Sequence, residues 1–390
     1  MGLVKGDQRA LRQLNRSTIL NLLRRQGRLS RVKLKHLSGL SGAAVTGVVA
    51  ELIRDQLLVE ESLGTSTGGR PPVLLAINPQ SCLAVGIKLM PDRLAAVLTN
   101  ISIETQSRIE YSLPETAPTA VVAAVAATVK SLLKKAGKSR KPLLGVGIGM
   151  PGMIDFRYGI CVHSPMLNWR DVPLGDMMEK SLHCPVYVDN DVNAFAEAER
   201  LFGRGRQSSN FVVVTIGRGI GSGLVINGRT FRGHRGGAGE LGHVPTQNKG
   251  RACQCGNRGC LEAYASEPAM LSRIRERALG KAGQSIDAML AGAKAGNKIV
   301  LEVLRDGGTR VGIAVASLVN LFDPELIVMG GEGMRLGEAF FGPLRESLFA
   351  HVFNGLGEGL EVVMEPWDDE AWARGAAGLV VGRTFDPNFG

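Results

Sequence analysis

The sequence is poor in the features that mark membrane-spanning and secreted proteins. It has no run of about 18 consecutive apolar residues, so no membrane-spanning helix is predicted. Its first residues, Met1 to Arg12, are charged and carry no apolar core of the kind found in signal peptides. Cysteine is scarce, at six residues, and nothing else points to an oxidising compartment. We therefore expect a cytoplasmic protein with no membrane partner.

The composition that is present describes a soluble protein with a basic end. A chain of 390 residues is too long for one ordinary core and predicts two or three domains. Of the net charge of +10, residues 1–80 carry +7, from 12 Lys and Arg against 5 Asp and Glu, which leaves only +3 for the rest. A small basic head on a nearly neutral body favours nucleic-acid binding by the head. A solvated basic face would explain the charge equally well.

Three of the cysteines gather close to a histidine. His243, Cys253, Cys255 and Cys260 are interleaved with glycines at 256 and 259, which let the loop fold back on itself. Zinc prefers four such ligands in a tetrahedron, so we predict a structural Cys3His zinc site. The alternatives are unconnected thiols or a disulfide, although neighbours in a Cys-x-Cys pair are poorly placed to bridge each other. The remaining cysteines are expected to be reduced core residues: Cys82, Cys161 and Cys184.

The first 80 residues have the pattern of a winged helix-turn-helix. Helices are predicted at 8–26, 31–37 and about 42–55, and strands at 57–61 and 73–77. Ser30 is a good N-cap for the second helix, in which Val32, Leu34 and Leu37 are expected to face inward. Three short helices with a tight turn before the third, followed by two strands, are typical of this DNA-binding fold.

Few polar side chains in this head are suited to reading DNA. The third helix offers Ser41 and Thr46, so base contacts there would lean on backbone and methyl groups. Arg70 stands between flexible glycines and a stiff Pro-Pro, and it could enter a minor groove. A plain interdomain linker is the alternative interpretation of that loop.

The rest of the chain alternates strands and helices, and this pattern alone supports only an α/β fold. The predicted elements are strands at 83–89, 94–100, 107–111, 143–149, 186–188, 211–216 and 224–226, a strand with a glycine turn at 323–331, and helices at 118–137, 266–279, 285–295, 297–320 and 370–381. The strand at 186–188 places Asn190 and Asp191 at its end, where sites gather in open α/β sheets. Those residues could bind sugar hydroxyls or could form a simple turn.

Two sequence elements carry a family resemblance. Glu240-x-Gly242-His243 and Cys253-x-Cys255-Gly256-x-x-Gly259-Cys260-x-Glu262 resemble the signature of the ROK family of repressors and sugar kinases, and flanking segments extend the likeness over nearly the whole chain. The resemblance implies a winged helix-turn-helix at 1–80 and a two-lobed actin-like (ribonuclease-H-like) body. Its first lobe would span 81–195, joined by a C-terminal helix at 370–390, and its second lobe, with the zinc loop, would span 196–369.

The same resemblance assigns a sugar site. It implies sugar-hydroxyl contacts from Asn190, Asp191, Glu240, His243 and Glu262, with His243 serving both zinc and sugar. In family kinases the aspartate matching Asp191 is the general base that deprotonates the attacking hydroxyl.

The nucleotide side departs from the kinase pattern. Family kinases open the first lobe with Asp-x-Gly-Gly-Thr-Lys, whereas this chain has Gly86-Ile87-Lys88-Leu89-Met90-Pro91-Asp92-Arg93, and Arg218 replaces a small hydroxyl residue. A phosphoryl-transfer site without its phosphate cradle loses most of its electrostatic stabilisation. We therefore predict no catalytic residues and a sugar-responsive repressor. An ATP-dependent sugar kinase with an appended DNA-binding head is the alternative.

The expected partners follow from that prediction. They are operator DNA, a sugar or sugar phosphate, and at least one further copy of the chain, as a homodimer or homotetramer, because operators are usually palindromic. A response to a partner protein is a further alternative.

Overall fold

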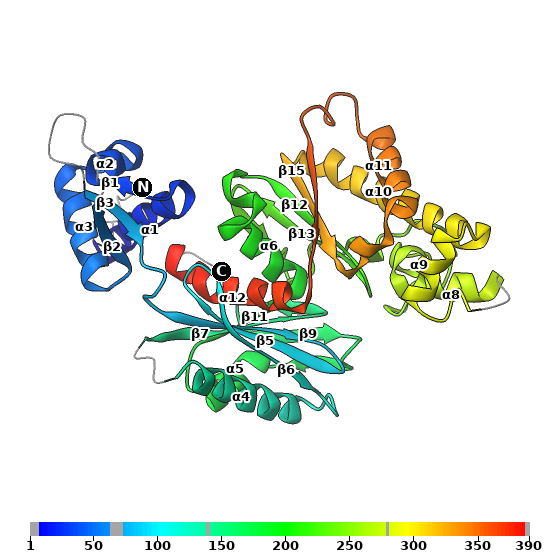
Figure 1. The fold of residues 1–390 in the computed structure, drawn as a ribbon, viewed down its shortest axis with the longest axis horizontal. Coiled ribbons are helices and arrows are strands. Elements are labelled where there is room, and N and C mark those ends of the chain that lie inside the picture. The colour runs from blue at the N-terminus through cyan, green and yellow to red at the C-terminus, as the bar shows by residue number, and fades with distance from the viewer. Residues whose placement is uncertain (1–7, 63–72, 138–140, 278–280, 387–390) are drawn as a thin grey trace, which may run out of the picture.

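The computed structural model describes residues 8–62, 73–137, 141–277 and 281–386. Its head begins with three helices, α1 (Gln8–Gln26), α2 (Arg31–Ser38) and α3 (Gly42–Arg54). A small sheet of β1 (Leu29–Ser30), β2 (Leu58–Ser62) and β3 (Val73–Ile77) follows, in the order β1-β3-β2. Ser30 caps α2 by accepting from the Lys33 amide, and Ser41 caps α3 by accepting from the Ala44 amide. The predicted winged helix-turn-helix is therefore present (Figure 1).

Two details of the head differ from the sequence prediction. Only Leu34 of α2 is buried, while Val32 is 80% exposed and Leu37 is 39% exposed. A helix of eight residues has room for only one buried stripe against α3, so its other apolar residues face water. The two-residue strand β1 was not predicted, because so short a segment carries no periodicity and exists only through its pairing with Leu74 and Leu75.

The first five-stranded sheet has the order β11-β7-β4-β5-β6. Its strands are β4 (Leu83–Leu89), β5 (Arg93–Asn100), β6 (Thr105–Ser112), β7 (Leu143–Met150) and β11 (Val186–Asn190). α4 (Pro118–Lys135) and α5 (Leu174–Leu182) lie on one face, and α12 (Asp369–Phe385) lies on the other (Figure 1). We call these elements the first lobe.

α12 approaches the first sheet very closely. A Cβ added to Gly86 or Gly147 would lie 1.9 Å from the carbonyl oxygen of Ala373 or Ala376 respectively, which no side chain could tolerate. The two glycines thus allow the end of the chain to return to the first lobe, as the sequence predicted. A small sheet beside it was not predicted and consists of β8 (Met153–Asp155), β9 (Ile160–Ser164) and β10 (Trp169–Val172).

The second five-stranded sheet repeats the topology of the first. Its order is β14-β13-β12-β15-β16, from β12 (Phe211–Ile216), β13 (Ile220–Ile226), β14 (Arg229–Phe231), β15 (Leu326–Gly331) and β16 (Glu361–Pro366). In each sheet the first three strands of the set run antiparallel and the last two add in parallel on the other side of the first strand. This duplication confirms the two-lobed, ribonuclease-H-like fold.

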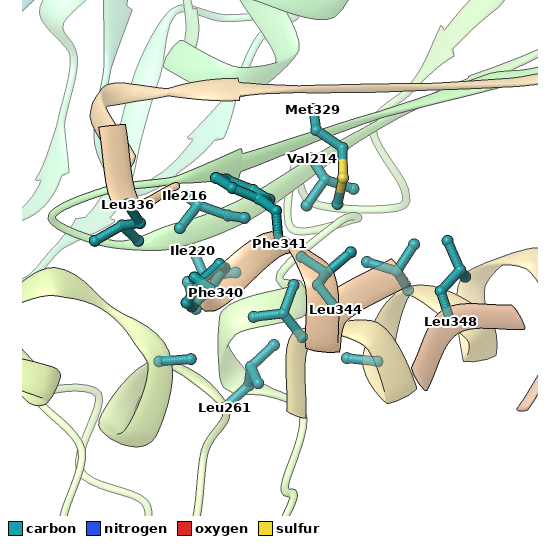
Figure 2. Packing of buried hydrophobic residues seen from close by; sticks show 14 of the residues in the cluster. Val214, Ile216, Ile220, Leu261, Met329, Leu336, Phe340, Phe341, Leu344 and Leu348 are labelled. Carbon is teal, nitrogen blue, oxygen red and sulfur yellow. The ribbon is translucent and has the colours of Figure 1, made fainter. Parts of the chain in front are cut away.

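Helices α10 (Lys298–Phe322) and α11 (Glu338–His351) cover one face of the second sheet. The shorter helices α7 (Glu262–Ala265), α8 (Glu267–Arg277) and α9 (Ile286–Lys294) pack against α10, and the short 3-10 turns are η2 (Leu241–His243) and η3 (Glu332–Leu336). Figure 2 shows Phe340, Phe341 and Leu344 of α11 packed beneath Val214 and Ile216 of β12. We call this sheet and these helices the second lobe.

The helix α6 (Asp191–Phe202) connects the two lobes, and the 3-10 turn η1 (Arg204–Gln207) follows it. It packs on α12 so closely that a Cβ on Gly375 would lie 3.1 Å from the Cα of Phe195. Its other side contributes to a buried cluster with the second sheet that includes Phe195, Phe211 and Trp367. α6 is therefore held by both lobes.

The carboxyl group of Glu199, on α6, should make the stability of the folded protein depend on pH. Glu199 is only 7% exposed, and burial raises its pKa from an ordinary value near 4.5 to about 7, although the Arg204 amide donates to it at 2.8 Å. A raised carboxyl pKa contributes stability at acid pH that is lost as the pH rises through the folded-state value. We expect Glu199→Gln, which keeps an acceptor for that amide, to be more stable than the wild type at pH 8 by ~2 kcal/mol and nearly equal to it near pH 4.5.

Denaturant unfolding of both proteins at the two pH values measures this difference. The exposed Glu358 gives a matched control, because Glu358→Gln removes the same charge without relieving any burial. An advantage of Glu199→Gln that did not grow between pH 4.5 and pH 8 would contradict the assignment.

Among the described residues, no single helix is long and apolar enough to cross a membrane; α2 and α3, with a bend of 117° between them, have the necessary length and composition only as a pair.

Candidate functional site

The predicted metal ligands come together in the loop between β14 and α7. The ligand atoms of His243, Cys253, Cys255 and Cys260 all lie within 4.8 Å of one another. Gly259 has φ +83°, and a Cβ there would lie 1.8 Å from the carbonyl oxygen of Gln247, so only glycine permits the chain to fold back at this point. The loop is tied by bridges between Pro245 and Cys260 and between Ala252 and Arg258.

The spacing of these atoms fits a tetrahedral zinc ion. The sulfurs of Cys255 and Cys260 are 3.7 Å apart, and Nδ1 of His243 is 3.6 Å from the sulfur of Cys253. Zn–S bonds of about 2.3 Å and a Zn–N bond of about 2.0 Å place two ligands of a tetrahedron about 3.5–3.8 Å apart. Without a cation, burial and the two neighbouring thiols raise the pKa of Cys260 to about 12, so this arrangement of thiols suits a positive charge at its centre.

One ring nitrogen of His243 points toward the cysteines of the predicted metal site, and the other points toward a carboxylate. Its Nδ1 lies at Cys253, whereas its Nε2 is 3.8 Å from the carboxylate of Glu240. Glu262, at the start of α7, accepts at 3.0 Å from the amide of Ile220, the first residue of β13. A metal-bound His243 would therefore be held beside both acids.

Three carboxylates from different elements lie near one another at this point. The Glu240 side chain keeps 44% of its surface accessible to solvent. The protein around its carboxyl group still removes part of the water that would stabilise the charged form, and this raises the Glu240 pKa. His243 opposes this rise, and the negative charges of Asp191 and Glu262 add to it. Burial likewise raises the pKa of Asp191, against an opposing effect of Lys88. The structure thus brings the predicted residues Asp191, Glu240, His243 and Glu262 close together.

Asn190 has a structural role at the same place. Its side-chain oxygen caps α6 by accepting from the amides of Val192 and Asn193, and its Nδ2 donates to the Gly152 carbonyl at 3.1 Å. Asp189 beside it is fully buried and pairs with Arg232 of the second lobe at 2.7 Å. Asn190 therefore fixes the start of α6, where Asp191 lies, and a sugar contact from its amide stays a prediction.

The nucleotide side contains an ion-pair cluster that sequence reasoning missed. Lys88 is 6% exposed, and its amine contacts Glu332 of the second lobe at 3.1 Å and Asp369 of α12 at 3.4 Å. The amine also lies 4.5 Å from the centre of the Trp372 ring. Arg218 and Asp92 form a second, looser ion pair across the lobes at 3.6 Å. The available signal was Lys88 itself, a single charged residue in the otherwise apolar strand β4.

We expect Lys88 and Glu332 to stabilise the protein jointly. Removing Lys88 leaves Glu332 without this counter-ion, and removing Glu332 leaves the buried Lys88 amine with Asp369 alone. Lys88→Met and Glu332→Gln should therefore each lower stability, and the double variant should lose less than the sum. A double-mutant cycle in denaturant should give a coupling of about 1 kcal/mol.

The exposed pair Arg345 and Glu338 serves as the control for that cycle, since solvent screening should reduce its coupling to a few tenths of a kcal/mol. Equal couplings for the two pairs would show that Lys88 is not part of a buried link between the lobes.

The predicted DNA-binding residues are only partly described. Ser41 and Thr46 are exposed on α3, but Ser41 caps the helix, and the Thr46 hydroxyl donates to the Gly42 carbonyl at 2.9 Å. Arg70 lies outside the described residues. Up to Ala50 the exposed face of α3 is otherwise made of small residues, Gly42, Ala43, Gly47 and Ala50, and Arg54 is exposed at the end of the helix. Such a face could approach DNA closely with its methyl groups and backbone.

A winged helix-turn-helix joined to two lobes of repeated topology, with carboxylates and an imidazole between the lobes, defines a DNA-binding protein built on the sugar-kinase type of actin-like fold. The chain belongs to the ROK family, whose sequence pattern matches residues 84–383.

The proteins similar to this chain include both regulators and sugar kinases. A xylose repressor from Caldicellulosiruptor bescii is 32% identical, over 96% of this chain and 97% of its own. The solved structure of a ROK family transcriptional regulator, a homolog of the E. coli MLC protein, matches with a TM-score of 0.84 at 27% identity, over 96% of this chain and 97% of its own. A ROK family glucokinase from Streptomyces griseus, solved with glucose and AMPPNP, matches with a TM-score of 0.65 at 29% identity, over 76% of this chain and 98% of its own.

Proposed function

We propose that this protein is a sugar-responsive transcriptional regulator, acting as a repressor of genes for carbohydrate uptake or catabolism. The observation that carries the proposal is Lys88. Lys88 lies on the first-lobe strand that bears the phosphate loop in family kinases. Its amine forms ion pairs with both Glu332 and Asp369. The acids and imidazole of the sugar side remain together, and a DNA-binding head precedes the body. The similarity to a xylose repressor over nearly the whole chain supports the same conclusion.

The residues of the sugar site have distinct roles in this proposal. Asp191 and Glu240 accept hydrogen bonds from sugar hydroxyls, and Nε2 of His243 meets a further hydroxyl. Glu262 is held on the Ile220 amide, so it presents its second oxygen in a fixed position. Zinc, when bound by His243, Cys253, Cys255 and Cys260, supplies a structural cation that fixes the imidazole ring. No residue is assigned a catalytic role.

The rival function is an ATP-dependent sugar kinase with the same head. One observation favours it, because Asp191 remains at the position of the general base in family kinases. The two functions differ in ATP turnover, which the repressor lacks. A coupled assay of ATP consumption with D-xylose, D-glucose and N-acetylglucosamine separates them, and sugar-dependent turnover above background would support the kinase.

We further propose the division of the chain into a head at 1–80, a first lobe at 81–195 completed by the C-terminal helix at 370–390, and a second lobe at 196–369. Each chain has one α3 to offer to DNA, so an operator with two half-sites requires a homodimer or homotetramer. Because its proposed partner is DNA, we propose that the protein is cytoplasmic.

For the head, we expect Arg70→Ala to weaken operator binding by at least about 1 kcal/mol without affecting sugar binding, because a groove contact would be lost. Operator affinity should also fall steeply with salt, since lysines and arginines displace cations condensed on the phosphates. Fluorescence anisotropy at several salt concentrations measures both effects. Unchanged affinity in Arg70→Ala would return this residue to the role of linker.

The experiment that tests the proposed function uses the full chain. A duplex selected from random DNA by the protein serves as operator, and a thermal-shift screen of neutral sugars and sugar phosphates identifies the effector, since a ligand that prefers the folded state raises Tm. We expect one sugar class to raise Tm and to change operator affinity at least several-fold. Failure to select any DNA would contradict a regulator, whereas DNA binding that no sugar alters would direct the search to a partner protein.

A further inference from the structure

The head is attached to the body by a buried arginine at the end of a body helix. Arg24 of α1 is only 7% exposed. One terminal nitrogen of its guanidinium donates to the carbonyls of Arg200 and Leu201, in the last turn of α6. Its other nitrogens donate to the side-chain oxygen of Asn21 at 3.0 and 3.2 Å. A cation at the C-terminus of a helix is favoured by the helix dipole.

The same segment of α1 also holds the end of α12. Asn21 donates to the Phe385 carbonyl at 2.6 Å, and the Ser17 hydroxyl donates to the same carbonyl. The Arg24 guanidinium lies 5.7 Å from the centre of the Phe385 ring. Apolar residues of the head, including Ile19 and Leu23, share one buried cluster with Leu201, Val381 and Phe385 of the body. The ends of α6 and α12 are therefore both docked on α1.

The other ends of these two helices lie at the site between the lobes. α6 begins at Asp191, and α12 begins at Asp369, which pairs with Lys88. The two helices pack backbone to backbone, because a Cβ on Gly378 would lie 3.4 Å from the Cα of Ala198. At 1.5 Å per residue, the 12 residues of α6 span about 18 Å from Asp191 to Phe202, beside the carbonyls that hold Arg24.

Arg24 is poorly supported by other charges. The nearest charged groups include Arg25, Arg200 and Arg206, whose repulsion, after burial, lowers the Arg24 pKa to about 9, while Glu197 opposes this. Its described hydrogen bonds are to carbonyl and amide oxygens. Since such bonds depend on the placement of the last turn of α6, a small shift of that helix changes how well the head is held.

We propose that α6 and α12 transmit the state of the sugar site to the DNA-binding head, and that Arg24 is the positioning residue at which the head receives it. This inference rests on the proposed function. A sugar held by Asp191 moves or stiffens the start of α6, the packed pair of helices moves as one body, and the carbonyls that hold Arg24 move with it. The head then takes a different position relative to its copy on the partner subunit, which changes the fit to two half-sites.

The test compares two neighbouring arginines in the full-length protein. Arg24→Met removes the donors and keeps most of the apolar stem, and the exposed Arg25→Met makes the same change of charge without a contact to α6. Operator affinity is measured with and without the most stabilising of D-xylose, D-glucose and N-acetylglucosamine. Sugar affinity is measured separately by calorimetry. Arg24→Lys tests whether a cation with less directional donors restores part of the response.

We expect Arg24→Met to bind the sugar within about twofold of the wild type while the sugar-induced change in operator affinity falls at least fivefold. Arg25→Met should respond to the sugar as the wild type does. If Arg24→Met does not fold, Asn21→Ala, which removes the contact to Phe385, should show the same loss of response. A normal response in Arg24→Met, or in Asn21→Ala if that variant is needed, overturns the coupling alone. A wild type that binds neither sugar nor DNA overturns the proposed function, and the coupling with it.

Discussion

Replacing Cys255 by serine should remove the metal and disable the sugar site. Purified wild-type protein should contain about one zinc per chain, and Cys255→Ser should contain almost none, because a neutral hydroxyl cannot replace a thiolate ligand. Structural zinc contributes roughly 10–16 kcal/mol to the folding of small zinc fingers. The loss here should be several kcal/mol, because the metal loop is attached to a second lobe with a large core of its own. Metal analysis and denaturant unfolding measure the two effects.

The loss of zinc should also reach the sugar site. His243 and Glu262 lie at the two ends of the metal loop, so a loosened loop no longer presents the imidazole and the carboxylate together. Sugar affinity should fall accordingly. Cys184→Ser provides the control, since this half-buried thiol lies outside the cluster and its replacement should leave zinc content and sugar affinity unchanged. A wild type that is equally stable with and without a chelator would rule out a structural metal.

Asp191→Asn should yield a regulator that holds DNA but ignores sugar. The substitution keeps the shape of the side chain and replaces a charge-assisted acceptor by a neutral amide. Such hydrogen bonds to a charged group contribute roughly 1.5–3 kcal/mol, so sugar affinity should fall about 10- to 150-fold. Operator affinity without sugar should stay close to that of the wild type, because Asp191 lies at the opposite end of α6 from the head.

The carboxylate of Asp191 should also make sugar affinity depend on pH. Burial raises the pKa of Asp191, so its ionised form, which accepts the sugar hydroxyl, is lost at a less acidic pH than for an exposed aspartate. Sugar affinity of the wild type should therefore weaken as the pH falls, and that of Asp191→Asn should show less of this trend. The exposed Asp176→Asn is the control. If Asp191→Asn responded to sugar as the wild type does, Asp191 would not belong to the sensor.

The metal site could be predicted from the sequence because it is local. Its three cysteines fall in one tight loop, and the glycines at 256 and 259 have the left-handed φ values that such a turn needs. The helix-turn-helix was predictable for the same reason, since Ser30 caps the second helix as its position suggested, whereas the cap that Ser41 provides for α3 was not predicted. Elements defined by pairing or packing were missed, among them α11 and the edge strand β16. α11 contains Gly342 and Pro343 in its interior, a pair typical of turns, which masks the helical spacing of Phe340, Leu344 and Leu348.

The nucleotide side marks the limit of reasoning from the sequence. The sequence by itself determined that the phosphate loop of family kinases is missing from Gly86 to Arg93 and that residues matching the metal and sugar positions of the family are present. Only the tertiary structure decided that the amine of Lys88 pairs with Glu332 and Asp369, because these partners are 244 and 281 positions away along the chain. The docking of Arg24 on α6, 176 positions away, was equally inaccessible. A ligand set within one loop leaves its spacing in the sequence, whereas an ion pair across two lobes depends on how separately folded sheets pack, and no local pattern records that.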